Sequence, residues 1–333
     1  MLLLIEFIIC TSVIVYAGTR LSKYGDIIAE KTGLGKTWIG VILMASVTSL
    51  PELVTGISSV TYADVPDIAV GNVLGACVFN MVTLAILDAV YRPMPVSAKA
   101  HHGNILSAGF GILLLSIVVM GLFFGNRIFS LWWIGLYSLL FAGIYFIAMR
   151  LVYFYEKKQI SLFIQDMAAE LKYKGISTKT AILNFCVNAV FVVIAAIFLP
   201  KIGEGIAEST GLGQTFVGNI FIAISTSLPE LVVCIAAVKI DAVDLAIGNL
   251  FGSNIFNIFI LAIDDFLFTK GPILSFVNQN HIISAVSAIA MASIAVIGLT
   301  YRSEKKPLFL AWDSIGILLL YMINLMSLYM MRE

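Results

Sequence analysis

The chain repeats a long segment of its own sequence. Residues 33–52, GLGKTWIGVILMASVTSLPE, match residues 211–230, GLGQTFVGNIFIAISTSLPE, without a gap. Residues 69–80, AVGNVLGACVFN, match residues 246–257, AIGNLFGSNIFN, in the same order. Two matched blocks at nearly one offset indicate that the chain contains a duplicated unit.

Both copies lie in a chain that is too apolar for a soluble domain, since 60% of the 333 residues are hydrophobic and 12% are charged. A membrane-spanning helix needs about 20 mainly apolar residues. Ten stretches have this character: 2–19, 37–61, 67–90, 104–124, 129–150, 180–200, 214–238, 245–267, 281–300 and 309–330. We predict an all-α membrane protein with ten transmembrane helices. A cleaved signal peptide is the weaker interpretation of the first stretch, which contains Glu6 and lacks a basic start.

The Lys and Arg residues orient these helices, because cytoplasmic loops are enriched in them. With the N-terminus outside, all but Arg127, Lys201, Lys270 and Arg332 fall on the cytoplasmic side. The sequence therefore predicts a multi-pass protein of the cell membrane with both termini outside. The net charge is zero, and we find no sign of a nucleic-acid partner or of an obligate protein partner.

The duplication divides the predicted helices into two groups of five. We predict a first five-helix repeat at 1–153, a cytoplasmic linker at 154–179 and a second repeat at 180–333. The linker is either a short helix on the membrane surface or a partly ordered connection. Because five is odd, the second repeat starts on the opposite side of the membrane, so the repeats are inverted. Inverted repeats are typical of secondary transporters, which bind their substrates near the membrane midplane between the repeats.

Each repeat places a proline and a glutamate at membrane depth. Proline cannot donate a backbone hydrogen bond, so Pro51 and Pro229 should break their helices and free the carbonyls of Val47 and Ser225. The following residues, Glu52 and Glu230, would then open the second half-helices. The hydroxyls nearby belong to Thr48, Ser49, Thr226 and Ser227. Carboxylates inside a membrane are costly and usually functional, and oxygen ligands of this kind predict a site for a hard cation such as Ca2+.

Other polar residues are less specific. We expect Asn80 and Asn257 to contact the ion, and Asn72 and Asn249 to bind backbone. The matching Asp88 and Asp265 end their spans, so we expect interfacial charges there. His101, His102 and His281 have no carboxylate or cysteine partner at metal spacing, which argues against a zinc site.

At these residues the chain resembles the calcium/cation antiporter superfamily, particularly its sodium/calcium exchanger branch. Its repeats carry the motifs G-T-S-x-P-E/D and G-N-x-x-G-S-x-x-x-N/D, and the resemblance extends over all ten predicted spans. It implies that Glu52 and Glu230 coordinate Ca2+ with the backbone carbonyls of Thr48 and Thr226, and serve Na+ in alternation. The positions that match ancillary residues of the family are Ser49, Ser227, Ser253, Asn80 and Asn257.

The chain also departs from this pattern. Val47 and Ser225 replace the glycine before Thr-Ser, and Ala76 replaces the serine matched by Ser253. Ala76 removes a hydroxyl that the family pattern offers to a Na+ site. Asn257 occupies a place where some members have Asp, which argues against K+ co-transport.

We therefore predict an antiporter, and no enzyme, that exchanges Ca2+ for Na+ by alternating access and uses no cofactor besides the transported ions. Its partners are Ca2+, Na+ and the lipid bilayer. Ca2+/H+ exchange by the same fold is the alternative, because protons can also empty two carboxylates. A membrane aspartyl protease and a passive channel are weaker alternatives, since both acids are Glu after Pro and no selectivity-filter loop is evident.

Overall fold

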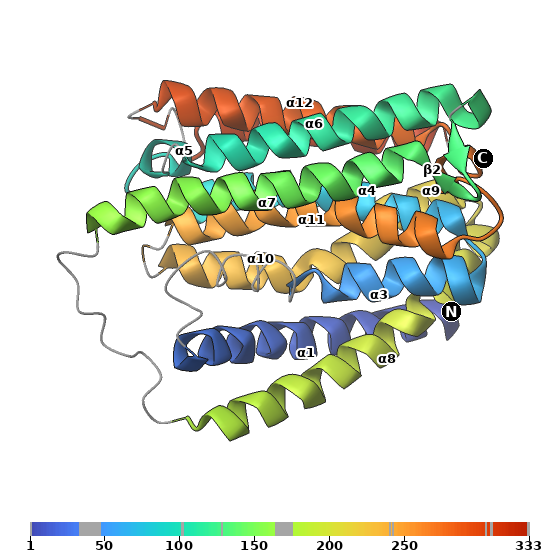
Figure 1. The fold of residues 1–333 in the computed structure, drawn as a ribbon, viewed down its shortest axis with the longest axis horizontal. Helices are drawn as coiled ribbons and strands as arrows, with labels where there is room; N and C mark the ends of the chain where they lie inside the picture. The colour runs from blue at the N-terminus through green and yellow to red at the C-terminus, as the bar shows by residue number, and fades with distance from the viewer. Residues whose placement is uncertain are drawn as a thin grey trace.

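The computed structural model describes residues 2–32, 48–100, 103–127, 129–163, 176–239, 241, 243–303, 305–306 and 309–331. Its long helices run roughly along one direction and form a bundle (Figure 1). Both chain termini lie at the same end of this bundle, which we call the terminal end (Figure 1). The helices are α1 Leu2–Thr32, α3 Leu50–Ser58, α4 Pro66–Val90, α5 Val96–Lys99, α6 Gly103–Phe124, α7 Leu136–Phe163, α8 Thr178–Thr210, α9 Gln214–Val217, α10 Ala223–Lys239, α11 Val243–Leu267, α12 His281–Tyr301 and α13 Trp312–Met330.

Short elements connect or extend these helices. Two π-helical turns, η2 Ser59–Ala63 and η4 Gly218–Ile222, follow α3 and precede α10. Two 3-10 turns, η3 Gly125–Arg127 and η5 Ile273–Ser275, lie in connections. Strands β1 Ser130–Leu131 and β2 Ile134–Gly135 form a small antiparallel hairpin.

The helices confirm a membrane protein with many spans. Within the described residues, eight helical segments are long and apolar enough to cross a membrane, and α7 adds a shorter apolar segment at Leu136–Val152. The predicted span 37–61 lies partly outside the described residues, which begin again at Thr48. The number of ten therefore stays a prediction, as does the division of the chain at 154–179, because residues 164–175 are not described.

The predicted span 129–150 starts too early. Residues 130–135 form the hairpin, whose turn residue Trp132 has a positive φ of 60°, and α7 begins at Leu136. The Gly135 amide donates to the Asp265 carboxylate at 2.9 Å, which holds the end of the hairpin against α11. Hydropathy alone did not predict this start, since Leu131, Trp132 and Trp133 are as apolar as the helix that follows.

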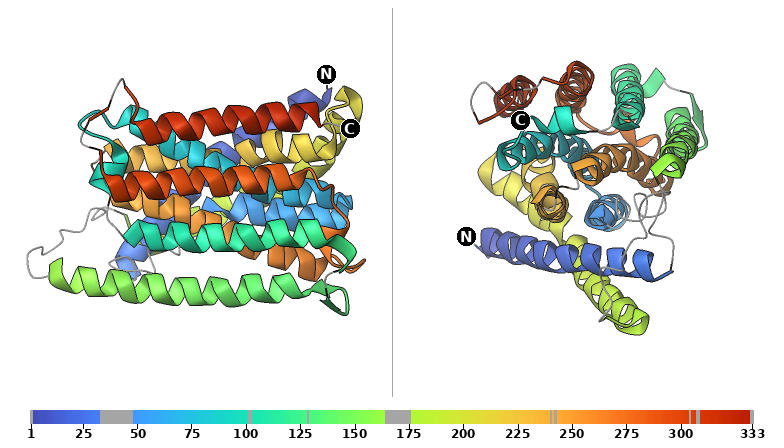
Figure 2. Two further views of the ribbon diagram at one scale, coloured as in Figure 1. Left: turned by 90° about the horizontal axis from the view of Figure 1, so that it is seen from above. Right: turned by 90° about the vertical axis from the view of Figure 1, so that its left-hand side faces the viewer.

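The bundle has three layers (Figure 2). The middle layer holds α3, α4, α10 and α11, and every residue of α4 from 68 to 85 is buried. On one side of it, α1 and α8 pack together around an apolar cluster that includes Ile14 and Leu199. On the other side lie α6, α12 and α13, and α7 lies at the edge of the bundle beside α6 and α11. Large exposed apolar residues such as Phe123, Phe146, Phe191 and Ile323 lie on the outer helices, as expected for contact with lipid.

Candidate functional site

The two predicted acids lie in the middle layer. Glu52 stands in the first turn of α3, directly after Pro51, and a carboxylate is favourable at a helix N-terminus. Glu230 follows Pro229 inside α10. Both glutamates have an exposed fraction of 0%. Since charged groups are rarely buried without partners, the surroundings of these side chains decide what the site can bind.

The hydroxyls that contact the two acids cross between the repeats. Ser227 donates to Glu52 Oε1 at 2.8 Å. Ser49 donates to Glu230 Oε1 at 2.7 Å, and Thr48 reaches the same oxygen at 3.1 Å. Ser49 is the N-cap residue directly before α3, yet its side chain makes no capping bond to α3, and its hydroxyl instead donates to the acid of the other repeat.

A further hydroxyl contacts one acid only. Ser253 on α11 donates to Glu230 Oε1 at 2.7 Å. The equivalent residue on α4 is Ala76, which is buried and has no hydroxyl to offer. Among the described residues, three hydroxyls therefore donate to Glu230 and one, that of Ser227, donates to Glu52. The two acids are not equivalent, although the repeats match closely at both.

Each glutamate keeps one carboxylate oxygen without a hydrogen-bond partner among the described residues. These oxygens are Oε2 of Glu52 and Oε2 of Glu230, and both are buried. A buried polar atom without a partner costs about 1–3 kcal/mol, and more when it carries charge. A cation or a proton bound by these oxygens would remove that cost. The paired carboxylates with their hydroxyls thus have the donor chemistry of a hard-cation site.

The two predicted asparagines are buried beside this site on α4 and α11. The amide of Asn80 donates to Asn254 Oδ1 at 2.9 Å, and its own oxygen has no partner among the described residues. Neither amide atom of Asn257 has such a partner. Two buried amide oxygens are thus available to an ion. The Asn80–Asn254 contact was missed in the sequence, because Asn254 matches Cys77 in the other repeat.

Thr226 and Asn72 connect the repeats next to Glu52. The Thr226 hydroxyl donates to Asn72 Oδ1 at 3.0 Å, and the Asn72 amide donates to the Glu52 carbonyl at 3.3 Å. The predicted backbone contact of Asn72 is therefore confirmed. The same expectation is wrong for Asn249, whose amide contacts Cys234 Sγ at 3.5 Å.

The predicted break at Pro229 is wrong. Helix α10 continues through Pro229 from Ala223 to Lys239, and the irregular segment is the π-turn η4 that precedes it. Proline is tolerated in a membrane helix when the freed backbone groups find other partners. Because Pro229 has no amide hydrogen, it still cannot donate to the Ser225 carbonyl. The hydroxyl of Ser225 donates to the carbonyl of Phe221 at 2.7 Å and accepts from the hydroxyl of Thr11 on α1 at 3.0 Å. Val47 lies outside the described residues.

Asp88 and Asp265 lie within two residues of the ends of α4 and α11, as the sequence suggested, but they are buried and hold loops in place. Asp88 also forms an ion pair with Lys306 at 3.0 Å. Asp88 accepts from the amides of Val96 and Ala311 at 2.9 and 2.6 Å. Asp265 accepts from the amides of Gly135 and Ile273 and from two hydroxyls. Each aspartate thus bonds the amide eight residues further on. The same loop anchor occurs in both repeats.

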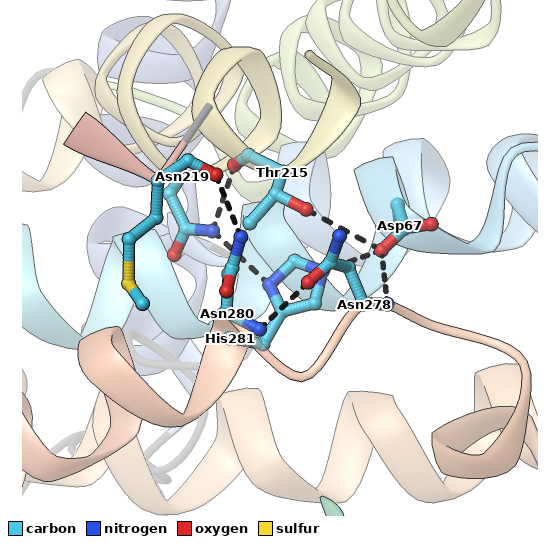
Figure 3. Close-up of polar contacts among 7 residues, drawn as sticks. Asp67, Thr215, Asn219, Asn278, Asn280 and His281 are labelled. Atoms are coloured by element: carbon cyan, nitrogen blue, oxygen red, sulfur yellow. Dashed lines mark hydrogen bonds and ion pairs between the residues drawn. The ribbon is translucent and has the colours of Figure 1, made fainter. Parts of the chain in front are cut away.

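His281 has a carboxylate partner that the sequence did not reveal. Its Nε2 lies 2.9 Å from Oδ1 of Asp67 on α4, and its Nδ1 lies 3.1 Å from Nδ2 of Asn219 in η4 (Figure 3). Asn219 Nδ2 also donates to Thr215 O at 2.8 Å. These contacts join α4, η4 and α12 at the terminal end, at sequence separations that no local pattern predicts. Among the described residues no group of three His, Cys, Asp or Glu side chains is placed to hold a metal ion. His101 and His102 lie outside those residues.

Comparisons with known proteins agree on one family. The model of the sodium/calcium exchanger protein family matches residues 2–154 and 180–330. The sodium/calcium exchanger MaX1 of Methanosarcina acetivorans is 27% identical over 92% of this chain and 93% of its own length. A solved structure of the sodium-calcium exchanger NCX_Mj covers 98% of both chains with 22% identity and a TM-score of 0.64. The crystal structure of the H+/Ca2+ exchanger CAX has a TM-score of 0.72 with 15% identity and covers 98% of this chain and 84% of its own.

Proposed function

Because the chain belongs to the sodium/calcium exchanger protein family, we propose that this antiporter exchanges Ca2+ for Na+ across the cell membrane by alternating access. The observation that carries this proposal is the pair of buried glutamates, Glu52 and Glu230, each with one carboxylate oxygen that has no partner in the described part of the chain. Two carboxylates have a formal charge of −2, which one Ca2+ neutralises. The protein performs no covalent chemistry on its ions and needs no cofactor.

We assign the following residues to the ion site. Glu52 and Glu230 bind Ca2+ directly, with the backbone carbonyls of Thr48 and Thr226. The amide oxygens of Asn80 and Asn257 complete the set of neutral ligands. The hydroxyls and carbonyls that serve Na+ when Ca2+ has left belong to Ser49, Ser227, Ser253, Val47 and Ser225. Na+ is suited to neutral oxygens of this kind, whereas a proton needs only the two glutamates.

We also propose ten spans in two inverted five-helix repeats, with both termini outside. Two observations support this topology. Both termini lie at one end of the bundle, which requires an even number of crossings (Figure 1). Basic residues such as Lys99, Lys239, Arg302 and Lys306 follow or precede helices at the other end, as expected for the cytoplasmic side.

Ca2+/H+ exchange is the second candidate. It is favoured by Ala76, which leaves Glu52 with one hydroxyl donor where Glu230 has three. A site with fewer neutral oxygens is a poorer Na+ site but can still exchange Ca2+ for protons. The fold is compatible with both driving ions, since it resembles solved exchangers of both kinds.

Flux measurements in proteoliposomes test these candidates. Vesicles loaded with Na+ and diluted into Na+-free buffer should take up radioactive calcium, at clamped voltage and without a pH gradient. Uptake that follows a pH gradient and ignores Na+ would establish Ca2+/H+ exchange instead. Uptake that needs no opposing ion would indicate a channel. Glu52→Gln and Glu230→Gln should each abolish uptake in a folded protein, and near-normal uptake by either variant would refute the shared site.

A further inference from the structure

A third acid is buried in the membrane-spanning part of the middle layer. Asp264 lies in α11 with an exposed fraction of 0%, and neither of its carboxylate oxygens has a hydrogen-bond partner among the described residues. The next residue, Asp265, is also buried but accepts four hydrogen bonds at the end of the same helix. Loop anchoring therefore explains Asp265 and leaves Asp264 without a structural role.

Asp264 lies directly against the backbone of α3. A Cβ atom built on Gly56 would stand 2.4 Å from Oδ2 and 2.7 Å from Oδ1 of Asp264, so a larger residue at that position would require the carboxyl to move. Gly56 follows Glu52 by four residues and therefore lies on the same face of α3, about 6 Å closer to the terminal end. Asp264 follows Asn257 by seven residues, which is close to two turns of α11. Asp264 therefore lies on the same side of α11 as Asn257, about two turns closer to the terminal end, just as Gly56 lies one turn beyond Glu52 on α3.

The other repeat has no such acid. Leu87 occupies the position that matches Asp264, and Cys234 occupies the position that matches Gly56. Cys234 is satisfied by Asn249 and the Ala246 carbonyl. The helix pair α4 and α10 therefore packs at the equivalent place without a carboxyl group. Packing of such a helix pair therefore does not require an acid. Only the pair α3 and α11 has one, and it lies toward the terminal end of the bundle.

Among the described residues, Asp264 forms no ion pair with a basic side chain, and Lys201 of α8, at the same end, lies over the ring of Tyr62. In the described structure, the charged residues of the elements packed on the same half of α11 are Glu52, Asp265 and, at the start of α4, Asp67, which pairs with His281. Lys270, in the loop after α11, pairs with Asp64 at the exposed surface. Helix α6 contains no charged residue, and Lys239 and Lys99 are the last residues of α10 and α5 at the opposite end. Arg150 lies midway along α7, over the ring of Phe154.

The same geometry decides between a proton and a metal ion at Asp264. Asp264 lies near the end of α11 but is fully buried in the protein, and a buried charge without a partner is costly. A bound Ca2+ needs six or more oxygen ligands, and Na+ also requires several. The carboxyl instead faces Gly56 of α3, and among the described residues it belongs to no group of three His, Cys, Asp or Glu side chains that could hold a metal ion. A proton neutralises the group and needs no further ligand.

We propose that Asp264 is a proton-binding residue of the transport cycle. It carries a proton while α3 and α11 are packed together. When the two helices separate and water enters from the terminal end, the O–H bond breaks and the proton passes to that water. Repacking of the helices requires that the carboxylate take a proton back. This inference rests on the proposed exchange function and adds to it a dependence on pH at the terminal side, separate from competition between protons and Ca2+ at Glu52 and Glu230.

Infrared spectroscopy tests the protonation without any transport. The starting protein is the double variant Glu52→Gln, Glu230→Gln, in which the ion-site acids cannot contribute. The difference spectrum between this protein and the same protein with Asp264→Asn, at neutral pH, should contain the C=O band of a protonated carboxylic acid. A difference spectrum with carboxylate bands only would overturn the proposal. Asp264→Leu, which copies Leu87 of the other repeat, serves as a second variant if the first does not fold.

The functional test separates maximal rate from apparent affinity. At saturating Ca2+, the exchange rate of the wild type should fall when the pH at the terminal side is lowered, by up to about tenfold per pH unit for one coupled proton. Asp264→Asn should lose this dependence and keep the effect of pH on the Ca2+ concentration at half-maximal rate. Asp64→Asn, which changes an exposed acid at the same end, is the control and should behave as wild type.

A wild-type pH profile of maximal rate in Asp264→Asn would refute the coupling. If Ca2+ exchange is absent altogether, the proposed function fails, and the infrared result still decides whether Asp264 binds a proton.

Discussion

Ser227 donates a 2.8 Å hydrogen bond to Glu52, although the two residues lie in different repeats. The reverse bond, from Ser49 to Glu230, measures 2.7 Å. The two bonds are equivalent by sequence but not by environment, because Glu230 also accepts from Thr48 and Ser253. The carboxylates therefore depend to different degrees on the hydroxyl that crosses from the opposite repeat.

Ser227→Ala should weaken Ca2+ binding more than Ser49→Ala. A hydrogen bond to a charged group contributes roughly 1.5–3 kcal/mol, so loss of the single donor to Glu52 should raise the Kd for Ca2+ by about ten- to a hundredfold. Ser49→Ala leaves two donors on Glu230 and should cost less than about tenfold. Calorimetric titration of the purified variants measures both values. Equal losses would show that the number of donors does not control affinity.

Ala76→Ser should improve the site for Na+. The substitution adds to α4 the hydroxyl that Ser253 supplies on α11, beside an acid that has one donor. We expect a lower Na+ concentration at half-maximal exchange and a smaller change for Ca2+. Ser253→Ala is the matched reverse change and should shift the Na+ dependence in the opposite direction. Because Ala76 is fully buried, thermal unfolding of both variants should be measured to exclude overpacking. An unchanged Na+ dependence in both would contradict a role of these hydroxyls in Na+ binding.

Asp265→Ala should destabilise the protein strongly. The carboxylate accepts from two backbone amides, Gly135 at 2.9 Å and Ile273 at 2.6 Å, and its loss leaves these donors without a partner. Each buried unpaired donor costs about 1–3 kcal/mol. The melting temperature in detergent should fall well below that of Asp64→Ala, which removes an exposed ion pair worth at most about 1 kcal/mol. Similar melting temperatures for the two variants would disprove the anchoring role.

A polar contact at the end opposite the termini should respond to acid. The Tyr91 hydroxyl donates to Asp241 at 2.8 Å and Lys99 lies 3.1 Å from it, and these two contacts lower the pKa of Asp241. A carboxyl with a lowered pKa stabilises the fold above its unfolded pKa, and this contribution is lost as the pH falls through the folded value. The melting temperature of the wild type should therefore exceed that of Asp241→Asn at neutral pH, and the difference should vanish in acid. A difference that persists in acid would mean that the ionised carboxylate is not its source.

The sequence predicted the central elements of the candidate site because the repeat marks them twice. The two TSLPE segments located Glu52 and Glu230, and the matched GN blocks located Asn80 and Asn257 on buried helices. Hydropathy predicted both ends of α4, α6, α11, α12 and α13 to within about three residues. It ended the spans of α1 and α8 too early, at 19 and 200, whereas these helices continue to Thr32 and Thr210. These features are local, so periodicity and duplication suffice to find them.

The partners of these residues were not predictable in the same way. The contact between Asp67 and His281 joins positions 214 residues apart, and nothing in the local sequence indicates which helices pack together. Pro229 was expected to end a helix, but a single missing hydrogen bond did not interrupt α10 in the packed bundle. Asp264 matches Leu87 and therefore escaped a search that relied on repetition. The features specific to this chain lie where its two repeats differ.

The crossed bonds between serine and glutamate also bear on how such a molecule originates. Neither half of the chain holds a complete set of donors for its own carboxylate, since Glu52 and Glu230 each receive a hydroxyl from the other half. At the ion site that we propose, one repeat alone could supply both carboxylates only as a pair of identical copies, and the internal duplication places such a pair in one polypeptide. Once fused, the halves were free to diverge, and substitutions such as Ala76 for serine could alter one side of the ion without altering the other. Coexpression of residues 1–163 and 164–333 as separate chains should accordingly restore binding that neither fragment has alone.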